Sequence, residues 1–316
     1  MPEVLCAGII VADHVCQPIS HLPAAGELVT TDGMLLTIGG CAANAAVDLA
    51  KMDVRVTIAG RVGADVFGRV VTDILRDAKV DVSAIQSTPG FDTSQTLIVN
   101  VKGEDRRFVH TFGANTAFQA TDIPLSLLDK VKILYLGGYL LMPTVTQDDL
   151  TTLFAKARAK GVKTVLDIVV PANSECRSRF DRLLPYVDLF LPNRDEGELI
   201  LGESDPLKQA ETFLRMGAAT CVITLGGGGS VLASGDLRLR AGAYSVPFID
   251  GSGGGDAFDA GYICGLLQNK GPEECLRIAS ALGASCVRAV GTTPGVFTRS
   301  ECDQFLRENT LTIERL

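Results

Sequence analysis

The fold is decided by one stretch of the sequence, Phe248-Ile249-Asp250-Gly251-Ser252-Gly253-Gly254-Gly255-Asp256-Ala257-Phe258. Its pattern predicts the end of a strand that runs through a glycine turn into a helix. Three consecutive glycines let backbone N–H groups converge without Cβ atoms in the way, and the start of the helix adds the positive end of its dipole. The stretch therefore predicts an anion-binding cradle.

Asp256, at the start of the expected helix, is a candidate catalytic base. A carboxylate that the helix dipole keeps ionised can accept the proton of an alcohol that attacks a phosphoryl group, and an ordinary carboxyl pKa is sufficient for that role. The chain contains no G-K-S or G-K-T, which excludes a P-loop. The alternative, that Asp256 only caps the helix, weighs about equally on this segment alone.

Around this stretch, apolar runs of strand length alternate with helical patterns. Strands are expected at residues 4–11, 54–59, 132–136, 163–168, 187–191 and 221–225, and helices at 42–52, 65–78, 146–160, 206–216, 256–268 and 272–289. Such alternation is typical of an α/β fold with a mostly parallel sheet.

Two stretches break the alternation and predict a small β-sheet. Residues 11–38 lack a helical period, and residues 93–110 read as a hairpin whose strands, 96–101 and 107–110, flank the turn at 102–105. We expect residues 1–316 to form one domain, with lid segments at about 12–38 and 93–115 inserted in the α/β body.

Further glycine turns recur at Gly39-Gly40, before a helix of small residues, and at Gly226 to Gly229, after an expected strand. A short strand is expected after the second turn, so that loop is predicted to lie flat beside a nucleotide, unlike a dinucleotide-binding turn. Tight helix packing and an ordinary glycine hairpin are the alternatives for the two turns.

Asn193 and Glu196 place an amide and a carboxylate one helical turn apart. Such a pair can hold a hydrated Mg²⁺ against phosphate oxygens, because this ion keeps several waters and needs few protein ligands. A solvated acidic helix start is the alternative, and base rates favour it.

The composition excludes several classes of protein. With 29 basic and 37 acidic side chains, a net charge of -8 and no Trp, the chain lacks the basic stripe and stacking residues of a nucleic-acid binder. Nine scattered cysteines form no C-x-x-C pair and suit a reducing cytosol. The apolar runs are too short to span a bilayer. We therefore expect a cytoplasmic protein that binds neither nucleic acid nor membrane.

Taken together, these motifs resemble the ribokinase-like family of carbohydrate and nucleoside kinases, also called the phosphofructokinase B type. The resemblance includes Asp13 after the first strand, the Gly39-Gly40 to Asn44 signature, Gly113-Ala114-Asn115, Asn193 with Glu196, the loop from Thr224 to Gly229, and the stretch from Asp250 to Asp256. It implies a three-layer α/β/α fold with a mostly parallel central sheet and a small β-sheet lid.

The resemblance also implies a role for each matching residue. Asp256 would be the catalytic base, and the sets implied for the other roles are as follows: Gly253, Gly254 and Gly255 for the anion hole, Asp13, Gly39, Gly40 and Asn44 for the acceptor's hydroxyls, Asn193, Thr224, Gly226 and Gly229 for the nucleotide, and Glu196 for Mg²⁺ through water. Many relatives bind a monovalent cation such as K⁺ where this chain has Asp250, Ser252, Cys286, Ala289 and Gly291.

The function implied is phosphorylation by ATP and Mg²⁺ of a primary alcohol on a sugar or sugar-like acceptor. Cys41 stands where ribokinase and phosphosugar kinases have Lys, so a phosphorylated acceptor is disfavoured. Four phenylalanines near the expected lid keep a nucleoside kinase open as an alternative: Phe91, Phe108, Phe112 and Phe118. A non-catalytic sugar or nucleotide sensor is a further alternative. Because lids of many relatives pair into dimers, a homodimer through the lid is also implied.

Overall fold

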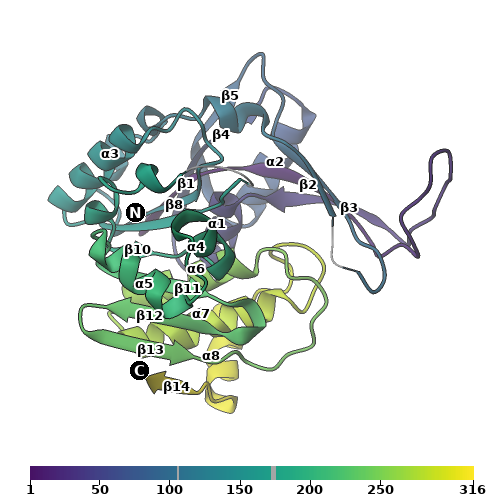
Figure 1. Ribbon diagram of the computed structural model, residues 1–316. Helices are drawn as coiled ribbons and strands as arrows, with labels where there is room; N and C mark the ends of the chain where they lie inside the picture. The colour runs from purple at the N-terminus through teal and green to yellow at the C-terminus, as the bar shows by residue number, and fades with distance from the viewer. Residues whose placement is uncertain (105–106, 172–175) are drawn as a thin grey trace.

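A computed structural model describes residues 1–104, 107–171 and 176–316 and is built on a large, mostly parallel sheet (Figure 1). In this part of the chain the sheet has ten strands in the order β14-β13-β12-β11-β10-β9-β8-β1-β4-β5, parallel from β5 to β11 and antiparallel beyond it. Their bounds are β1 Val4–Gly8, β4 Val56–Gly63, β5 Asp81–Thr88, β8 Ile133–Tyr139, β9 Lys163–Ile168, β10 Leu189–Phe190, β11 Thr220–Thr224, β12 Ser230–Ser234, β13 Leu237–Ala241 and β14 Ile313–Arg315.

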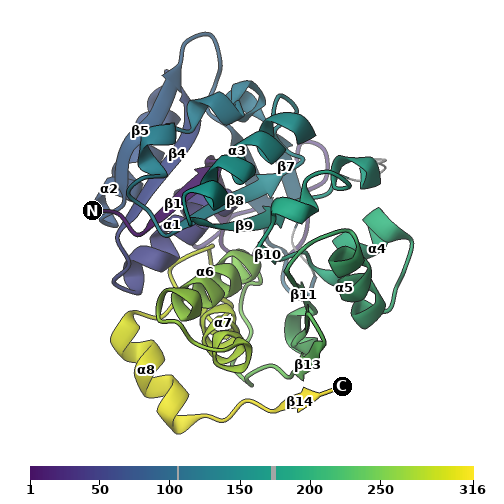
Figure 2. The ribbon, with the colours of Figure 1, turned by 90° about the vertical axis from the view of Figure 1, so that its left-hand side faces the viewer.

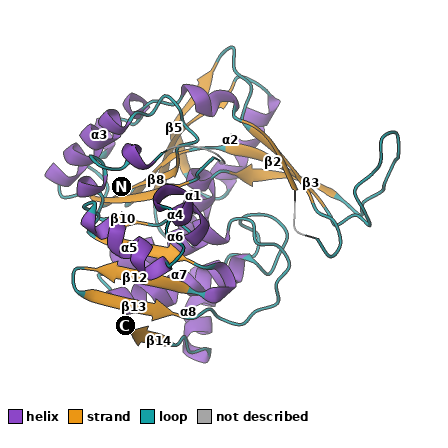
Figure 3. Ribbon diagram, in the orientation of Figure 1, coloured by secondary structure: helices purple, strands orange, loops and turns teal. Residues whose placement is uncertain are grey.

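Helices cover both faces of this sheet (Figure 3). In β1, Val4 and Cys6 belong to a core with α1, α6 and α7, whereas Leu5 and Ala7 belong to a second core with α3 and α5. The helices are α1 Cys41–Lys51, α2 Val66–Asp77, α3 Gln147–Ala159, α4 Arg194–Leu201, α5 Pro206–Arg215, α6 Gly254–Leu267, α7 Pro272–Cys286 and α8 Arg299–Glu308. Figure 2 shows α6 and α7 side by side on one face. The three-layer α/β/α prediction is confirmed.

A second sheet projects from this body and has the order β3-β2-β6-β7 (Figure 1). Its strands are β2 Val11–Cys16, β3 Met34–Gly39, β6 Gln95–Val99 and β7 Arg107–Thr111. The antiparallel pairing of β6 with β7 confirms the predicted hairpin. Asp105, in its expected turn, lies outside the described residues.

The apolar run 4–11, predicted as one strand, is divided between the two sheets. β1 ends at Gly8, whose φ of +133° directs the chain out of the body, and β2 begins at Val11 in the other sheet. Only glycine fits here, because a Cβ at Gly8 would lie 2.1 Å from the carbonyl oxygen of Gly137. The sequence prediction of a single strand was wrong.

The strand end predicted at Phe248 and Ile249 is also wrong, because both residues lie outside regular structure and are exposed. The backbone N–H groups of Ile249 and Asp250 donate to the carbonyl of Val287, at 2.8 and 3.2 Å, which ties this segment to the end of α7. The helix α8 was not predicted. Among the described residues, the structure contains no helix of the length and apolarity that crossing a membrane requires.

Candidate active site

Two neighbouring helices, α1 and α6, begin on glycines with left-handed backbones. The N-cap Gly40 of α1 has a φ of +90° and the N-cap Gly253 of α6 a φ of +75°, and neither helix start is capped by a side chain. A Cβ at Gly253 would lie 2.3 Å from the Thr292 carbonyl oxygen, and one at Gly40 2.6 Å from that of Ile9. Both positions therefore require glycine, and both leave the helix N-terminus open to an anion.

Asp256 lies in the first turn of α6, three residues after the N-cap Gly253. The alternative that Asp256 itself caps the helix is therefore wrong. The Nδ2 of Asn44, on α1, donates to the Oδ2 of Asp256 at 2.8 Å, which joins the two glycine-begun helices. Burial raises the pKa of Asp256, while the Asn44 bond lowers it in part. From the sequence, only the helix dipole was considered at this carboxylate, and the rise of its pKa by desolvation was not foreseen.

Asp13, on β2, lies 5% exposed beside the first glycine pair. Burial raises the pKa of Asp13 to about 6, and the charges of Asp256 and Asp250 add to that rise against a hydrogen bond from Thr96. A Cβ at Gly39 would lie 2.1 Å from the Oδ2 of Asp13. The glycine at 39 thus makes room for the carboxylate.

A cavity of about 440 Å³ joins the two regions. Its walls come from the second sheet and from the starts of α1 and α6, and include Asp13, Cys41, Thr96, His110 and Asp256. Because Asp13 and Asp256 face one cavity, the structure brings together the two carboxylates that the sequence assigned to binding and catalysis. No Lys or Arg of the described chain lines it.

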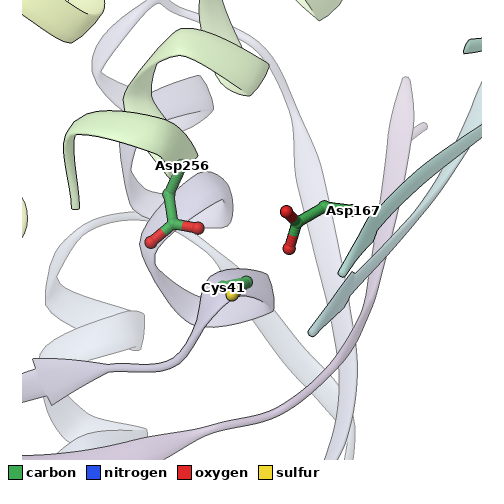
Figure 4. Close-up of side chains that lie close together, drawn as sticks. All are labelled: Cys41, Asp167 and Asp256. Atoms are coloured by element: carbon green, nitrogen blue, oxygen red, sulfur yellow. The ribbon is translucent and has the colours of Figure 1, made fainter. Parts of the chain in front are cut away.

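Asp167, at the end of β9, was not identified from the sequence although it lies beside Asp256. Its Oδ2 accepts the N–H of Gly138 at 3.0 Å, and burial raises its pKa well above the ordinary value. Figure 4 shows Asp167, Asp256 and Cys41 converging from three elements. The carboxyl end of a parallel strand is the usual position for a ligand-binding side chain, and this signal in 163–168 could have pointed to it.

Asn193 and Glu196 form a reciprocal capping box at the start of α4. The Oδ1 of Asn193 accepts the N–H of Glu196 at 2.9 Å, and the Oε2 of Glu196 accepts the N–H of Asn193 at 2.9 Å. Burial raises the pKa of Glu196 to about 7, with the charge of Asp256 contributing. Glu196 is therefore a partly buried carboxylate whose pKa is influenced by the charge of Asp256.

The glycine loop after β11 lies next to this capping box. A parallel bridge pairs Asn193 with Thr224, and the Thr224 N–H donates to the Pro192 carbonyl at 3.2 Å. Gly226 and Gly227 are exposed, and no atom lies within 4 Å of a Cβ built on either. These two glycines form an open surface beside Asn193. The strand β12 follows the loop, as predicted.

Comparison with protein families gives a match of residues 1–299 to the model of the pfkB family of carbohydrate kinases. The chain belongs to this family. It is therefore a phosphotransferase that acts on an alcohol group, and the resemblance recognised from the glycine motifs is confirmed.

A curated relative is similar in sequence over nearly the full length, and solved structures share the fold. The chain is 29% identical over 306 residues to a ribokinase of Haemophilus influenzae, covering 95% of this chain and 96% of that protein. The structure of Arabidopsis thaliana ribokinase complexed with ribose and ATP matches with a TM-score of 0.82 at 23% identity, covering 97% and 99% of the two chains. Sinorhizobium meliloti adenosine kinase matches with a TM-score of 0.79 at 23% identity, covering 96% and 99%.

The residues expected at a monovalent-cation site in this pfkB kinase are bonded mainly to one another. Asp250 accepts the N–H of Ser252 on Oδ1 and that of Gly291 on Oδ2, both at 2.9 Å. The Cys286 thiol lies 3.2 Å from the Ser252 carbonyl oxygen, and the Ala289 N–H donates to the Cys286 carbonyl. Only the buried Ser252 hydroxyl has no partner among the described residues. Carboxylate and backbone carbonyl oxygens that accept one N–H group keep a second lone pair for a cation, so K⁺ binding at this site stays a prediction.

Proposed function

We propose that this kinase transfers the γ-phosphoryl group of ATP to a primary alcohol of a sugar or sugar-like acceptor. The observation that carries the proposal is the position of Asp256, whose carboxylate faces the cavity from the first turn of a glycine-begun helix. Asp256 orients the acceptor hydroxyl and takes its proton as the oxygen bonds to phosphorus and ADP departs. The backbone N–H groups of Gly254 and Gly255 face the transferring group.

On the nucleotide side, the loop from Thr224 to Gly229 is proposed to hold ATP, with Asn193 at its edge. Burial raises the pKa of Glu196 to about 7. Its carboxylate oxygens fit a hydrated Mg²⁺, which would neutralise phosphate charge when bound. The capping box fixes the position of Glu196 before the nucleotide arrives, because both backbone N–H groups of the box are already satisfied. Asp256 and Glu196 would thus lie on either side of the transferred phosphoryl group.

On the acceptor side, Asp13 and Asn44 are proposed to bind hydroxyl groups, Asp13 through charge-assisted hydrogen bonds. An uncharged acceptor is favoured, because no Lys or Arg of the described residues lines the cavity to pair with a phosphate. One observation also favours a nucleoside acceptor. The cavity is also lined by the apolar side chains of Ile98, Phe108 and Phe112, on which a base can stack.

The four-stranded sheet is proposed to act as a lid that excludes water during transfer. On the face away from the cavity, this sheet exposes Met34 and Val109, at 70% and 66%. An apolar face of this kind suits pairing of two lids in a homodimer. All nine cysteines are free, and eight of them are buried, which is consistent with action in the reducing cytoplasm.

An acceptor panel tests the reaction. Pentoses, hexoses, keto-sugar acids and nucleosides are incubated with the protein and MgATP, with and without K⁺, and ADP release is measured. We expect release with at least one uncharged acceptor, and the comparison with and without K⁺ tests the predicted cation site. If the protein binds both ATP and an acceptor and forms no phosphorylated product, it is a sensor and the proposed reaction is wrong.

A further inference from the structure

Three potential metal ligands of different chemistry meet at the inner end of the cavity. One sulfur, of Cys41 on the first residue of α1, and carboxylate oxygens of Asp167 on β9 and Asp256 on α6 all lie within 4.8 Å of one another (Figure 4). A tetrahedral zinc ion with bonds of about 2.0 to 2.3 Å separates its ligands by roughly 3.5 Å. Small side-chain rotations are therefore enough to bring the three atoms onto one ion.

In the part of the chain that the structure describes, no cationic side chain pairs with the carboxylates around this cluster. Asp167, Asp256 and Glu196 take part in none of the ion pairs formed by the described residues, and neither does the buried Asp259, whose Oδ2 accepts the Tyr135 hydroxyl at 3.1 Å. Carboxylates crowded together in a buried site repel one another unless protons or a cation compensate them. The arrangement therefore favours cation binding.

Asn44 gives an independent indication of a missing ligand. This residue is 3% exposed and lies one helical turn after Cys41 on α1. Its Nδ2 is bonded to Asp256, but its Oδ1 is buried and has no hydrogen-bond partner among the described residues. A buried carbonyl oxygen without a partner is costly, and a bound ion or its coordinated water would satisfy it.

We propose that Cys41, Asp167 and Asp256 bind a thiophilic divalent cation, of which Zn²⁺ is the reference case, and that this ion blocks the acceptor. Three protein ligands and one water complete a four-coordinate zinc site. Mg²⁺ is not the ion of this site, because it prefers oxygen ligands and near-octahedral geometry. Binding replaces the thiol proton of Cys41 by the metal and involves no oxidation.

The site has a direct consequence for activity because Asp256 belongs to it. A carboxylate that ligates zinc cannot take the proton of an acceptor hydroxyl, and the ion itself occupies the inner end of the acceptor cavity. The site thus links catalysis to the local concentration of free thiophilic metal. Metal binding does not depend on the proposed reaction, whereas the inhibition does, so the two are measured separately.

Cobalt binding tests the site without an activity assay. Co²⁺ is titrated into the metal-free full-length protein, and absorption from thiolate-to-cobalt charge transfer is recorded, with Zn²⁺ added afterwards as competitor. We expect one equivalent of Co²⁺, a charge-transfer band, and loss of the band on addition of Zn²⁺. Cys41→Ser should abolish the band, whereas the control Cys16→Ser, on a buried cysteine at the far end of β2, should keep it.

A second variant keeps the test decisive if the serine variant is poorly folded. Asp167→Asn preserves the acceptor for the Gly138 N–H but removes a charged ligand, and should weaken Co²⁺ binding by at least about tenfold. A band that persists in Cys41→Ser, or the absence of Co²⁺ binding in equilibrium dialysis, overturns the site.

Inhibition is then measured in the kinase assay. We expect micromolar free Zn²⁺, set by a chelating buffer, to raise the KM for the acceptor far more than the KM for MgATP. Each variant is compared with its own uninhibited rate, and Cys41→Ser should be at least about tenfold less sensitive than the unchanged protein. Equal sensitivity of the two proteins would show that Zn²⁺ acts elsewhere.

Discussion

Helices α1 and α6 begin differently from α4. The first two start on glycines that provide no side-chain cap, whereas α4 starts on Asn193, whose side chain and that of Glu196 satisfy the first N–H groups. A helix start without a cap leaves its N–H groups available to a ligand, and a capped start fixes a side chain instead. In the proposed reaction the open starts would receive the anion and the acceptor, and the capped start would place Glu196.

The largest effect is expected from Asp256→Asn, which removes the carboxylate from the open start of α6. Turnover should fall by about a thousandfold, because a positioned general base contributes this order of rate enhancement. Binding of MgATP, measured by calorimetry, should change little. If the folded variant keeps more than a tenth of the original turnover, Asp256 is not the base.

Gly253→Ala tests whether α6 needs a glycine start. The new Cβ would meet the Thr292 carbonyl at 2.3 Å at a φ of +75°, so the turn must move and turnover should fall roughly a hundredfold, as for loss of one anion-hole donor. Gly202→Ala at the end of α4 is the matched control, because its φ is +68° and no atom lies within 4 Å of the added Cβ. That variant should lose about 1 kcal/mol of stability and keep its turnover. Equal turnover of the two variants would contradict the comparison.

The carboxylate of Asp13 lies beside the open start of α1. Its ionisation should lower the free energy of unfolding. With the folded-state pKa of Asp13 raised to about 6, the folded protein holds this proton more tightly than the unfolded chain. The contribution to stability is therefore complete below pH 4 and is lost as the pH rises to about 6, amounting to about 2 to 3 kcal/mol. Urea unfolding across this range measures the loss.

Asp13→Asn is the control for this pH effect, since it has the same shape and no titration. Its stability should fall less between pH 4 and 6 than that of the unchanged protein, by the amount just given. Above pH 6 the stability of both proteins should continue to fall with rising pH, because the pKa of Glu196 is raised to about 7. Identical curves would show that Asp13 does not titrate in this range.

The smallest effect is expected at the capped start. Asn193→Ala should cost about 1 kcal/mol of unfolding free energy, a typical value for loss of an N-cap. The capping box of α8, formed by Thr298 and Glu301, provides a matched control in Thr298→Ala, with a similar loss. Only Asn193→Ala should also raise the KM for MgATP. A similar KM increase in both variants would separate Asn193 from nucleotide binding.

Much of the fold follows from local patterns. The alternation of apolar runs and helical segments predicted the central sheet, and the β6–β7 hairpin was recognised from its turn. The division of 4–11 at Gly8 was not predictable, because every residue there is apolar or small and the break depends on the distant Gly137 carbonyl. Local patterns carry no information about such a contact.

The site was predicted in part for a similar reason. Glycine turns are visible in the sequence, and they led to Asp256, whereas Asp13 was predicted only from the family resemblance. Asp167 lies within an apolar run, so its proximity to Cys41 arises only when β9 takes its place in the sheet. The raised pKa values of Asp13 and Asp256 likewise depend on burial, which is a tertiary property.

The passage of the chain from β1 to β2 limits how the smaller sheet can move. Ile10, between the strands, is held at both backbone groups by the Asn115 side chain, at 3.2 Å through its N–H and 3.0 Å through its carbonyl. Because Ile10 is held in place, we expect β2 to pivot about this residue. Asp13 lies about 10 Å further along the strand. If the smaller sheet moves as the proposed lid, we expect a swing about Ile10 that carries the Asp13 carboxylate through a small arc.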